Sequence, residues 1–255
     1  MITLRTAREI ATMREAGRVV ANVLAAVRDA SGVGVKPIDL DQLARRMLHE
    51  AGAVSSFEHY HPRWAPIPYP AVICLSVNDA IVHGIPDARP LRDGDILSID
   101  FGAAVDGLHA DAAITVPIGD VDEPGRRLIR TTEAALQAGI AAARPGNRLG
   151  DIGAAVGAIG RGAGYGLAEN LGGHGVGDAM HEDPHVANEG SPGRGLKLQA
   201  GLVIAIEPMF IEGGHDEHDL RADGWTVATS DGSRAAHQEH TLAVTKDGPV
   251  VLTLP

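Results

Sequence analysis

Residues 96–116 read ILSIDFGAAVDGLHADAAITV, and this stretch decides the fold. Asp106 and Gly107 near its middle are the strongest short-range signal for a β-hairpin. A two-residue loop at this position produces three apolar cross-strand pairs: Phe101 with Ala112, Ile99 with Ile114, and Leu97 with Val116. A slip of one residue would turn every side chain to the opposite face. The stretch therefore predicts two antiparallel strands with one apolar face.

The other face of this hairpin carries two carboxylates. The same register pairs Asp100 with Ala113 and Asp111 with Gly102, which makes the two aspartates diagonal neighbours, roughly 7 Å apart or less. At about 4 Å and an effective dielectric constant of about 20, two such charges repel each other by about 4 kcal/mol. One aspartate must therefore be protonated, or a cation must lie between the two, or both must lean into solvent.

Helical periodicity flanks the hairpin on both sides. The spacing of apolar residues predicts four helices, over residues 10–27, 40 to about 52, 122–143 and 149–156. Thr6 and Glu9 form a capping-box pattern ahead of the first helix, and Asp122 with Pro124 opens the third. The second and fourth helices share an apolar spacing, and each follows a break that contains Gly and Pro.

The order of helix, helix and strands occurs twice along the chain. We therefore predict one domain over residues 1–255 with two pseudo-symmetric halves, about 1–120 and 121–255, each of two helices plus antiparallel strands. Coincidence is the alternative, because the apolar spacing of the second and fourth helices is common. Strands and helices cluster rather than alternate, which favours an α+β class over a doubly wound parallel sheet.

Composition excludes several classes of protein. The formal charge of -11 argues against nucleic acid or an anionic membrane as the main partner. Cys74 is the only cysteine, which excludes an intramolecular disulfide and fits a reducing compartment. No stretch has the pattern of a signal peptide or a membrane span. We expect a soluble, monomeric, cytoplasmic protein.

Further groups of the metal-binding type follow in the second half. His174 lies among glycines in LGGHGVG (171–177), Glu207 closes an apolar run, and Glu239 lies inside a predicted strand. An unpaired buried charge is costly, so each carboxylate needs a partner unless it lies at an exposed strand end. With the two aspartates these residues form an oxygen-rich set that suits Mn, Fe, Co or Mg better than a thiolate zinc site.

Two other clusters suggest metal binding less strongly. His181, Glu182 and His185 spell H-E-x-x-H, the zinc-protease motif, which functions on a helix. Pro184 lies between the two histidines and costs about 3 kcal/mol in a helix, so we expect a strand or surface segment instead. A second polar cluster follows two glycines and is interpreted as a loop: His215, Asp216, His218 and Asp219.

Short motifs spread along the chain carry a family resemblance. They are VHGIP (82–86), SID (98–100) with an aspartate eleven residues later, GHGVG (173–177), MHEDP (180–184), IEP (206–208) and EHT (239–241). Over nearly its whole length the chain resembles the type I methionine aminopeptidases, which have the pita-bread fold. This resemblance implies that the predicted domain is a single catalytic domain.

The resemblance also implies which residues bind metal and substrate. Two divalent ions, Co, Mn or Fe with Zn or Mg as further choices, would be bound by Asp100, Asp111, His174, Glu207 and Glu239, with Asp111 and Glu239 bridging. Glu207, His181 and His83 would be the catalytic residues. The substrate would contact His83, His181, Cys74, Tyr69, Trp225 and Tyr60. The chain departs from the family pattern at Ala112 and Ala113, where the family usually shows hydroxyl residues near the bridging aspartate.

The activity implied is removal of the initiator methionine from new chains when the second residue is small. The partners would be the N-termini of nascent polypeptides, close to the ribosome. A non-catalytic binding protein of the same fold is one alternative, and a metal-free hydrolase that resembles creatinase is another. Both should lack part of the carboxylate set, whereas this chain has all five proposed ligands.

Overall fold

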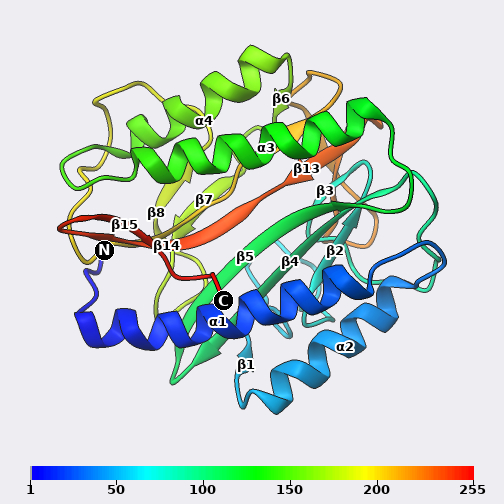
Figure 1. Cartoon of the computed structure of the whole chain (residues 1–255), viewed down its shortest axis with the longest axis horizontal. Coiled ribbons are helices and arrows are strands. Elements are labelled where there is room, and N and C mark those ends of the chain that lie inside the picture. Colours follow the sequence, from blue (N-terminus) through cyan, green and yellow to red (C-terminus); the bar gives the residue numbers. More distant parts are fainter. Residues whose placement is uncertain (1) are drawn as a thin grey trace.

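Four helices cover one face of a curved antiparallel sheet in the computed structural model, which describes residues 2–255 (Figure 1). The helices are α1 (Ala7–Ala30), α2 (Pro37–Glu50), α3 (Glu123–Ala142) and α4 (Leu149–Ala163). In the view of Figure 1, α1 and α2 cross the lower part and α3 and α4 the upper part. The α+β pita-bread class predicted from the sequence is confirmed.

Strands fill the space between and behind the two helix pairs. The strands of the first half are β1 (Val54–Ser55), β2 (Cys74–Val77), β3 (Ala80–Val82), β4 (Ile96–Val105) and β5 (Leu108–Pro117). Those of the second half are β6 (Gly166–Leu167), β7 (Gly172–Gly175), β8 (Glu182–Ala187), β9 (Val203–Ile206), β10 (Met209–Ile211), β11 (His218–Leu220), β12 (Val227–Thr229), β13 (Ala235–His237), β14 (Glu239–Thr245) and β15 (Gly248–Val251).

The predicted helix starts agree with the capping contacts. The Thr6 hydroxyl accepts the backbone N–H of Glu9 at 3.3 Å, and the Glu9 carboxylate accepts that of Thr6 at 2.7 Å, so both halves of the capping box form. At the start of α3 the Asp122 side chain accepts the N–H of Gly125 at 3.0 Å. These contacts satisfy N–H groups that have no partner inside the helix.

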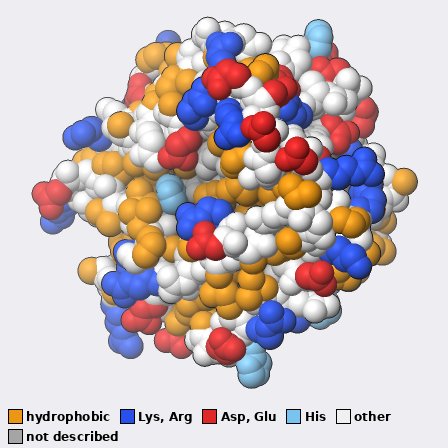
Figure 2. Space-filling model, turned by 45° about the vertical axis from the view of Figure 1, so that its right-hand side comes forward, with side chains coloured by type: hydrophobic (Ala, Val, Ile, Leu, Met, Phe, Trp, Pro, Cys, Tyr) orange, Lys and Arg blue, Asp and Glu red, His pale blue; other side chains and the backbone are white. Residues whose placement is uncertain are grey.

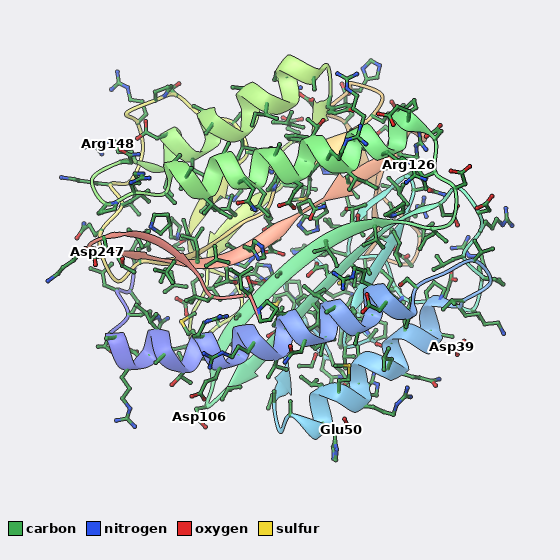
Figure 3. The ribbon with its side chains drawn as sticks, viewed as in Figure 1. Asp39, Glu50, Asp106, Arg126, Arg148 and Asp247 are labelled. Carbon is green, nitrogen blue, oxygen red and sulfur yellow. The ribbon has the colours of Figure 1, made fainter. Side chains whose placement is uncertain are left out.

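The hairpin of β4 and β5 has the register that its sequence predicts. Asp100 is opposite Ala113, and Asp111 is opposite Gly102. Asp106 and Gly107 have φ values of 49° and 78°, as a two-residue turn of this twist requires. Figure 3 shows Asp106 at the tip of the hairpin, below α1 in that view.

Each helix pair buries the apolar face of the strands beneath it. The first core lies between α1, α2 and the hairpin and includes Leu24, Leu97 and Phe101. The second lies between α3, α4 and the later strands and includes Leu136 and Ile204. Because side chains alternate across a strand, the polar residues of β4 and β5 point to the face that the helices leave uncovered.

One large sheet joins the two halves. Its main path runs β1-β4-β5-β14-β9-β7-β8, with β2 on β4 and β15 on β14. The halves meet where β5 pairs with β14, at Ala113 opposite Glu239. A continuous sheet fits one domain over the whole chain, while the internal duplication with halves at about 1–120 and 121–255 stays a prediction.

The zinc-protease motif does not lie on a helix. Glu182 and His185 belong to β8, where Pro184 is buried and His185 is exposed. On a strand, positions four apart lie too far from each other to hold one ion with the geometry that the motif needs. The expectation of a strand or surface segment is therefore confirmed.

Among the described residues, the helices include no membrane-spanning segment and the visible face has no broad basic area. Within residues 2–255 no helix has both the length and the apolar character that crossing a bilayer requires. On the face that Figure 2 shows, Lys and Arg side chains are interspersed with Asp and Glu, and no broad area of basic side chains is visible there.

We predict that Gly173 is required for close strand packing beside His174. A Cβ atom at this position would overlap the carbonyl oxygen of Ala205 on β9. Gly173→Ala should therefore lower the free energy of unfolding by about 1 to 3 kcal/mol in denaturant titrations of the metal-free protein. Gly162→Ala on α4 is the control, because a Cβ there meets open space and alanine favours the helix by up to about 1 kcal/mol. Equal effects of both changes would contradict the prediction.

Candidate metal centre

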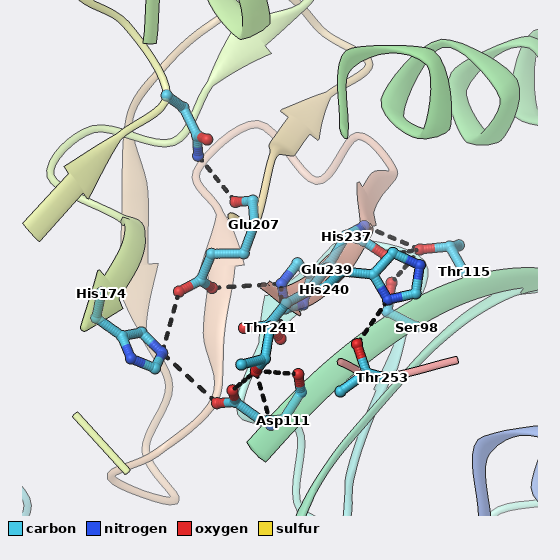
Figure 4. A network of polar contacts seen from close by, with 11 residues as sticks. Ser98, Asp111, Thr115, His174, Glu207, His237, Glu239, His240, Thr241 and Thr253 are labelled. Atoms are coloured by element: carbon cyan, nitrogen blue, oxygen red, sulfur yellow. Dashed lines mark hydrogen bonds and ion pairs between the residues drawn. The ribbon is translucent and has the colours of Figure 1, made fainter. Parts of the chain in front are cut away.

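Five consecutive strands of the large sheet position the five predicted metal ligands. Asp100 lies on β4, Asp111 on β5 and Glu239 on β14, which are neighbours in that order. Glu207 directly follows β9, and His174 lies on β7, which are the next two strands. Four of these side chains point toward one another in Figure 4: Asp111, His174, Glu207 and Glu239.

Small residues leave room between the carboxylates. Asp100 is opposite Ala113, which is in turn opposite Glu239, so only a methyl group stands between two acids of one row. Asp111 is opposite Gly102, where Ser56 and Phe57 occupy the place that a side chain would take. The hairpin thus provides a space bounded by carboxylates on three strands.

His174 presents its free nitrogen to this space. Its Nδ1 donates to the carbonyl oxygen of Gly175 at 2.9 Å, and because a carbonyl can only accept, Nδ1 carries the hydrogen. In the neutral ring Nε2 then offers a lone pair, and this nitrogen lies 3.6 Å from Asp111 Oδ2 and 3.6 Å from Glu207 Oε1. A hydrogen bond from the other ring nitrogen, here Nδ1, usually orients a metal-binding imidazole.

Burial makes the carboxylates hard to ionise without a cation. Desolvation, with the negative charge of Asp111 added to it, raises the pKa of Asp100 to about 8 and that of Glu207 to about 8. The same causes raise the pKa of Glu239 well above its usual value. At neutral pH these carboxyl groups are protonated unless a bound cation displaces the protons.

Several donor atoms at the site have no partner in the protein. Among residues 2–255, Asp100 Oδ1 and Glu239 Oε1 are shielded from solvent and accept no hydrogen bond. Asp111, His174 and Glu239 each offer an atom within 4.8 Å of the other two. Buried oxygens and one imidazole nitrogen at this spacing fit divalent cations.

Thr241 of β14 forms hydrogen bonds with Asp111 from across the strand pair. Ala112 and Ala113 remove hydroxyl groups from β5, yet Thr241 lies across the strand pair. Its hydroxyl is 2.9 Å from Asp111 Oδ1 and accepts the Asp111 N–H at 3.0 Å (Figure 4). Asp111 therefore has a buried hydrogen-bond partner.

An apolar pocket of about 590 Å³ opens above the carboxylates. Three of the residues predicted for the substrate pocket are buried in its wall: Tyr69, Cys74 and Trp225. The Tyr69 and Trp225 rings meet edge to face at 5.0 Å, and the Trp225 Nε1 donates to the Ile67 carbonyl at 2.9 Å. Tyr60 also lines the pocket. The pocket thus has a fixed aromatic wall beside the site.

Both predicted catalytic histidines border this pocket. Burial, with His237 nearby, lowers the pKa of His83 to about 4, and its φ of 60° is a strained value for a residue other than glycine. His181 lies 4.2 Å from His174 between ring centroids, and its Nδ1 is 3.1 Å from the Tyr60 hydroxyl. Surrounding protein and His174 lower the pKa of His181, so both imidazoles are neutral at pH 7.

Several residues at the site have no role in the sequence-based prediction, among them Phe57, Trp64 and His237. Phe57 and Trp64 line the pocket, and His237 lies beside Glu207 and Glu239. A signal for His237 exists, since it stands two positions before Glu239 and alternation places both on one face. No spacing rule indicates Phe57 or Trp64, because they lie in an irregular segment before β2.

The second polar cluster is occupied by ion pairs. Asp216 contacts Arg161 at 2.6 Å, and Arg161 also contacts Glu189 at 2.7 Å. His218 begins β11, a short strand that pairs with β12. The interpretation of residues 215–219 as a polar loop is therefore right for the first part and wrong for the strand at His218–Leu220.

The buried carboxylates need cations to neutralise their charge, and they lie beneath a pocket able to hold an amino-acid side chain. These two features together define a metal-dependent hydrolase. Comparison with known proteins agrees. The family model described as metallopeptidase family M24 matches residues 11–246. The methionine aminopeptidase 1 of Mycobacterium tuberculosis is 47% identical, over 100% of this chain and 96% of that protein. The methionine aminopeptidase 1 of Bacillus subtilis is 41% identical, over 99% of each.

Solved structures show the same relationship. The methionine aminopeptidase of Thermotoga maritima superposes with a TM-score of 0.95 and 38% identity over 100% of both chains. The Xaa-Pro dipeptidase of Bacillus anthracis shares the fold, with a TM-score of 0.78, 21% identity, 98% of this chain and 61% of that one. The chain belongs to metallopeptidase family M24 and, within it, to the methionine aminopeptidases.

We predict that Thr241 supports metal binding through Asp111. Thr241→Val removes the hydroxyl but keeps the shape of the side chain, so metal affinity should fall by about ten- to a hundredfold in calorimetric titrations. Thr245→Val is the matched control on the same strand, since the Thr245 hydroxyl bonds only to the turn at residues 247–248. Equal affinities of both variants and the parent would contradict this role.

Proposed function

We propose that this protein is a cytoplasmic monomer that removes N-terminal methionine from nascent polypeptides, close to the ribosome, when the second residue is small. Two divalent cations, Co, Mn or Fe with Zn or Mg as further choices, would be bound by Asp100, Asp111, His174, Glu207 and Glu239. The observation that carries the proposal is the convergence of these five groups, from five neighbouring strands, beneath the aromatic pocket.

The pocket fits the methionine side chain. Tyr69, Cys74 and Trp225 offer aromatic and sulfur surface, which suits a flexible, polarisable thioether. Cys74 is opposite Asp100 in the β2–β4 pair, so this wall adjoins the carboxylates directly. Methionine in this pocket would place its amino group and carbonyl over the metal centre.

Proton transfer is assigned to Glu207. Divalent cations, when bound, would polarise the scissile carbonyl and lower the pKa of the attacking water from about 15.7 towards 7. Glu207 ionises in their presence and can accept a proton from that water and return it to the leaving amine. Asn188 donates to the Glu207 backbone carbonyl at 3.0 Å and so holds this residue at the end of β9.

The two neutral histidines contact the reacting amide. Burial raises the pKa of Tyr60, so its hydroxyl stays protonated and donates to Nδ1 of His181. Nε2 of His181 then carries a hydrogen that can stabilise charge developing on the carbonyl oxygen. His83 would contact the scissile nitrogen, since it lies on the side of the pocket formed by Trp225, 6.1 Å between ring centroids.

An assay of the metal-depleted protein tests the proposal. With Mn, Fe, Co, Zn or Mg added back, it should release methionine from Met-Ala-Ser but not from Met-Leu-Ser. Asp111→Asn should abolish this release, because the variant loses one carboxylate of the centre, whereas His185→Ala on the exposed side of β8 should keep it. Failure of every metal to restore release would favour a non-catalytic binding protein, and loss only in His185→Ala would favour a zinc-protease site.

We predict that Trp64 assists substrate binding at the mouth of the pocket. Its side chain is 54% exposed, yet its ring stacks on His83 at 6.2 Å and meets Trp225 at 4.9 Å. An aromatic pair contributes about 0.5 to 1.5 kcal/mol, so Trp64→Ala should raise KM for Met-Ala-Ser by about two- to tenfold, with a smaller change in kcat. Ile67→Ala is the control, since this side chain is exposed and its carbonyl bond to Trp225 remains. An unchanged KM in Trp64→Ala would rule the role out.

A further inference from the structure

His237 lies beside the carboxylates and takes no part in the predicted ligand set. It ends β13, and its side chain is 2% exposed. Nε2 lies 3.3 Å from Glu207 Oε2 and 3.9 Å from Glu239 Oε2. Within the described part of the chain, neither ring nitrogen of His237 has a hydrogen-bond partner. A buried imidazole with two unsatisfied nitrogens is costly, which calls for a ligand.

The distances match those of groups that share a cation. Two atoms bound to one ion at about 2.1 Å lie about 3 to 3.5 Å apart for tetrahedral or octahedral angles. Nε2 of His174 is 3.6 Å from two carboxylate oxygens, and His237 makes a similar approach to another two. Glu207, His237 and Glu239 offer donor atoms within 4.8 Å of one another, a second group beside that of Asp111, His174 and Glu239.

The backbone of His237 is fixed on both sides by one hydroxyl. Thr115 Oγ1 accepts the N–H of His237 at 2.9 Å and donates to its carbonyl oxygen at 2.7 Å (Figure 4). Ser98 lies 2.8 Å from the same oxygen of Thr115 and completes the network. β13 also pairs with β10 at Met209, so the backbone that places the imidazole beside Glu207 is fixed from two sides.

We propose that Nε2 of His237 is a sixth protein ligand of the metal centre, which binds one cation together with Glu207 and Glu239. This inference rests on the proposed metal centre and adds to it. Each cation then has its own imidazole, His174 for one and His237 for the other. Imidazole favours Fe, Co, Ni and Zn over Mg, so the second position should prefer these metals.

A titration of metal-depleted protein with Co(II) tests this ligand. By calorimetry and visible absorption the parent should bind two equivalents. His237→Gln should bind the second at least about tenfold more weakly, with a changed spectrum, because an amide can hydrogen-bond to Glu207 but is a poor ligand. His240→Gln is the matched control, since His240 contacts Thr253 instead and should behave as the parent.

Each outcome separates the possibilities. If His237→Gln binds two equivalents of Co(II) with the affinities and spectrum of the parent, the assignment of His237 as a ligand is wrong. The proposed metal centre itself would not be affected by that result. Failure of the parent to bind Co(II) would overturn the centre itself. Should His237→Gln not fold, ring-nitrogen NMR of the parent with Zn(II) decides instead: two imidazoles should show a metal-induced shift, and a response from one alone would exclude His237.

Discussion

Repulsion among buried carboxylates is the constraint on which the rest of the site depends. Asp100, Asp111, Glu207 and Glu239 lie close together in a region that burial makes unfavourable for charge. Such an arrangement survives only because the opposite face of the same strands is well packed against helices, as around Phe101. The stability of the two cores thus offsets the cost of the site, and cations remove that cost when they bind.

Strand register determines where the carboxylates lie relative to one another. Since the hairpin turn at Asp106 and Gly107 fixes the pairing of β4 with β5, it also fixes which residues point away from the helices. Ala113 then separates Asp100 from Glu239 by a single methyl group across the join of the two halves. A turn on the edge of the molecule therefore decides where the acids at its centre lie.

Features that depend on neighbouring residues follow from the sequence, whereas contacts between distant residues do not. The capping of α1 by Thr6 and the register around Asp100 follow from neighbouring residues, and both were predicted. The bond from Thr241 to Asp111 joins residues 130 positions apart, so no local pattern around Asp111 indicates it. Trp64 lies in a segment without periodicity, and its place over His83 depends on how that segment packs.

Burial acts in opposite directions on the two kinds of group at the site. It raises the pKa of Asp100 and Glu207 to about 8, and it lowers the pKa of His83, His181 and His237. Around neutral pH the acids hold protons while the imidazoles do not. Binding of cations must therefore displace protons from carboxyl groups but none from His237, so affinity rises with pH until the acids ionise. His237, whose two ring nitrogens have no hydrogen-bond partner among the described residues, needs no such step.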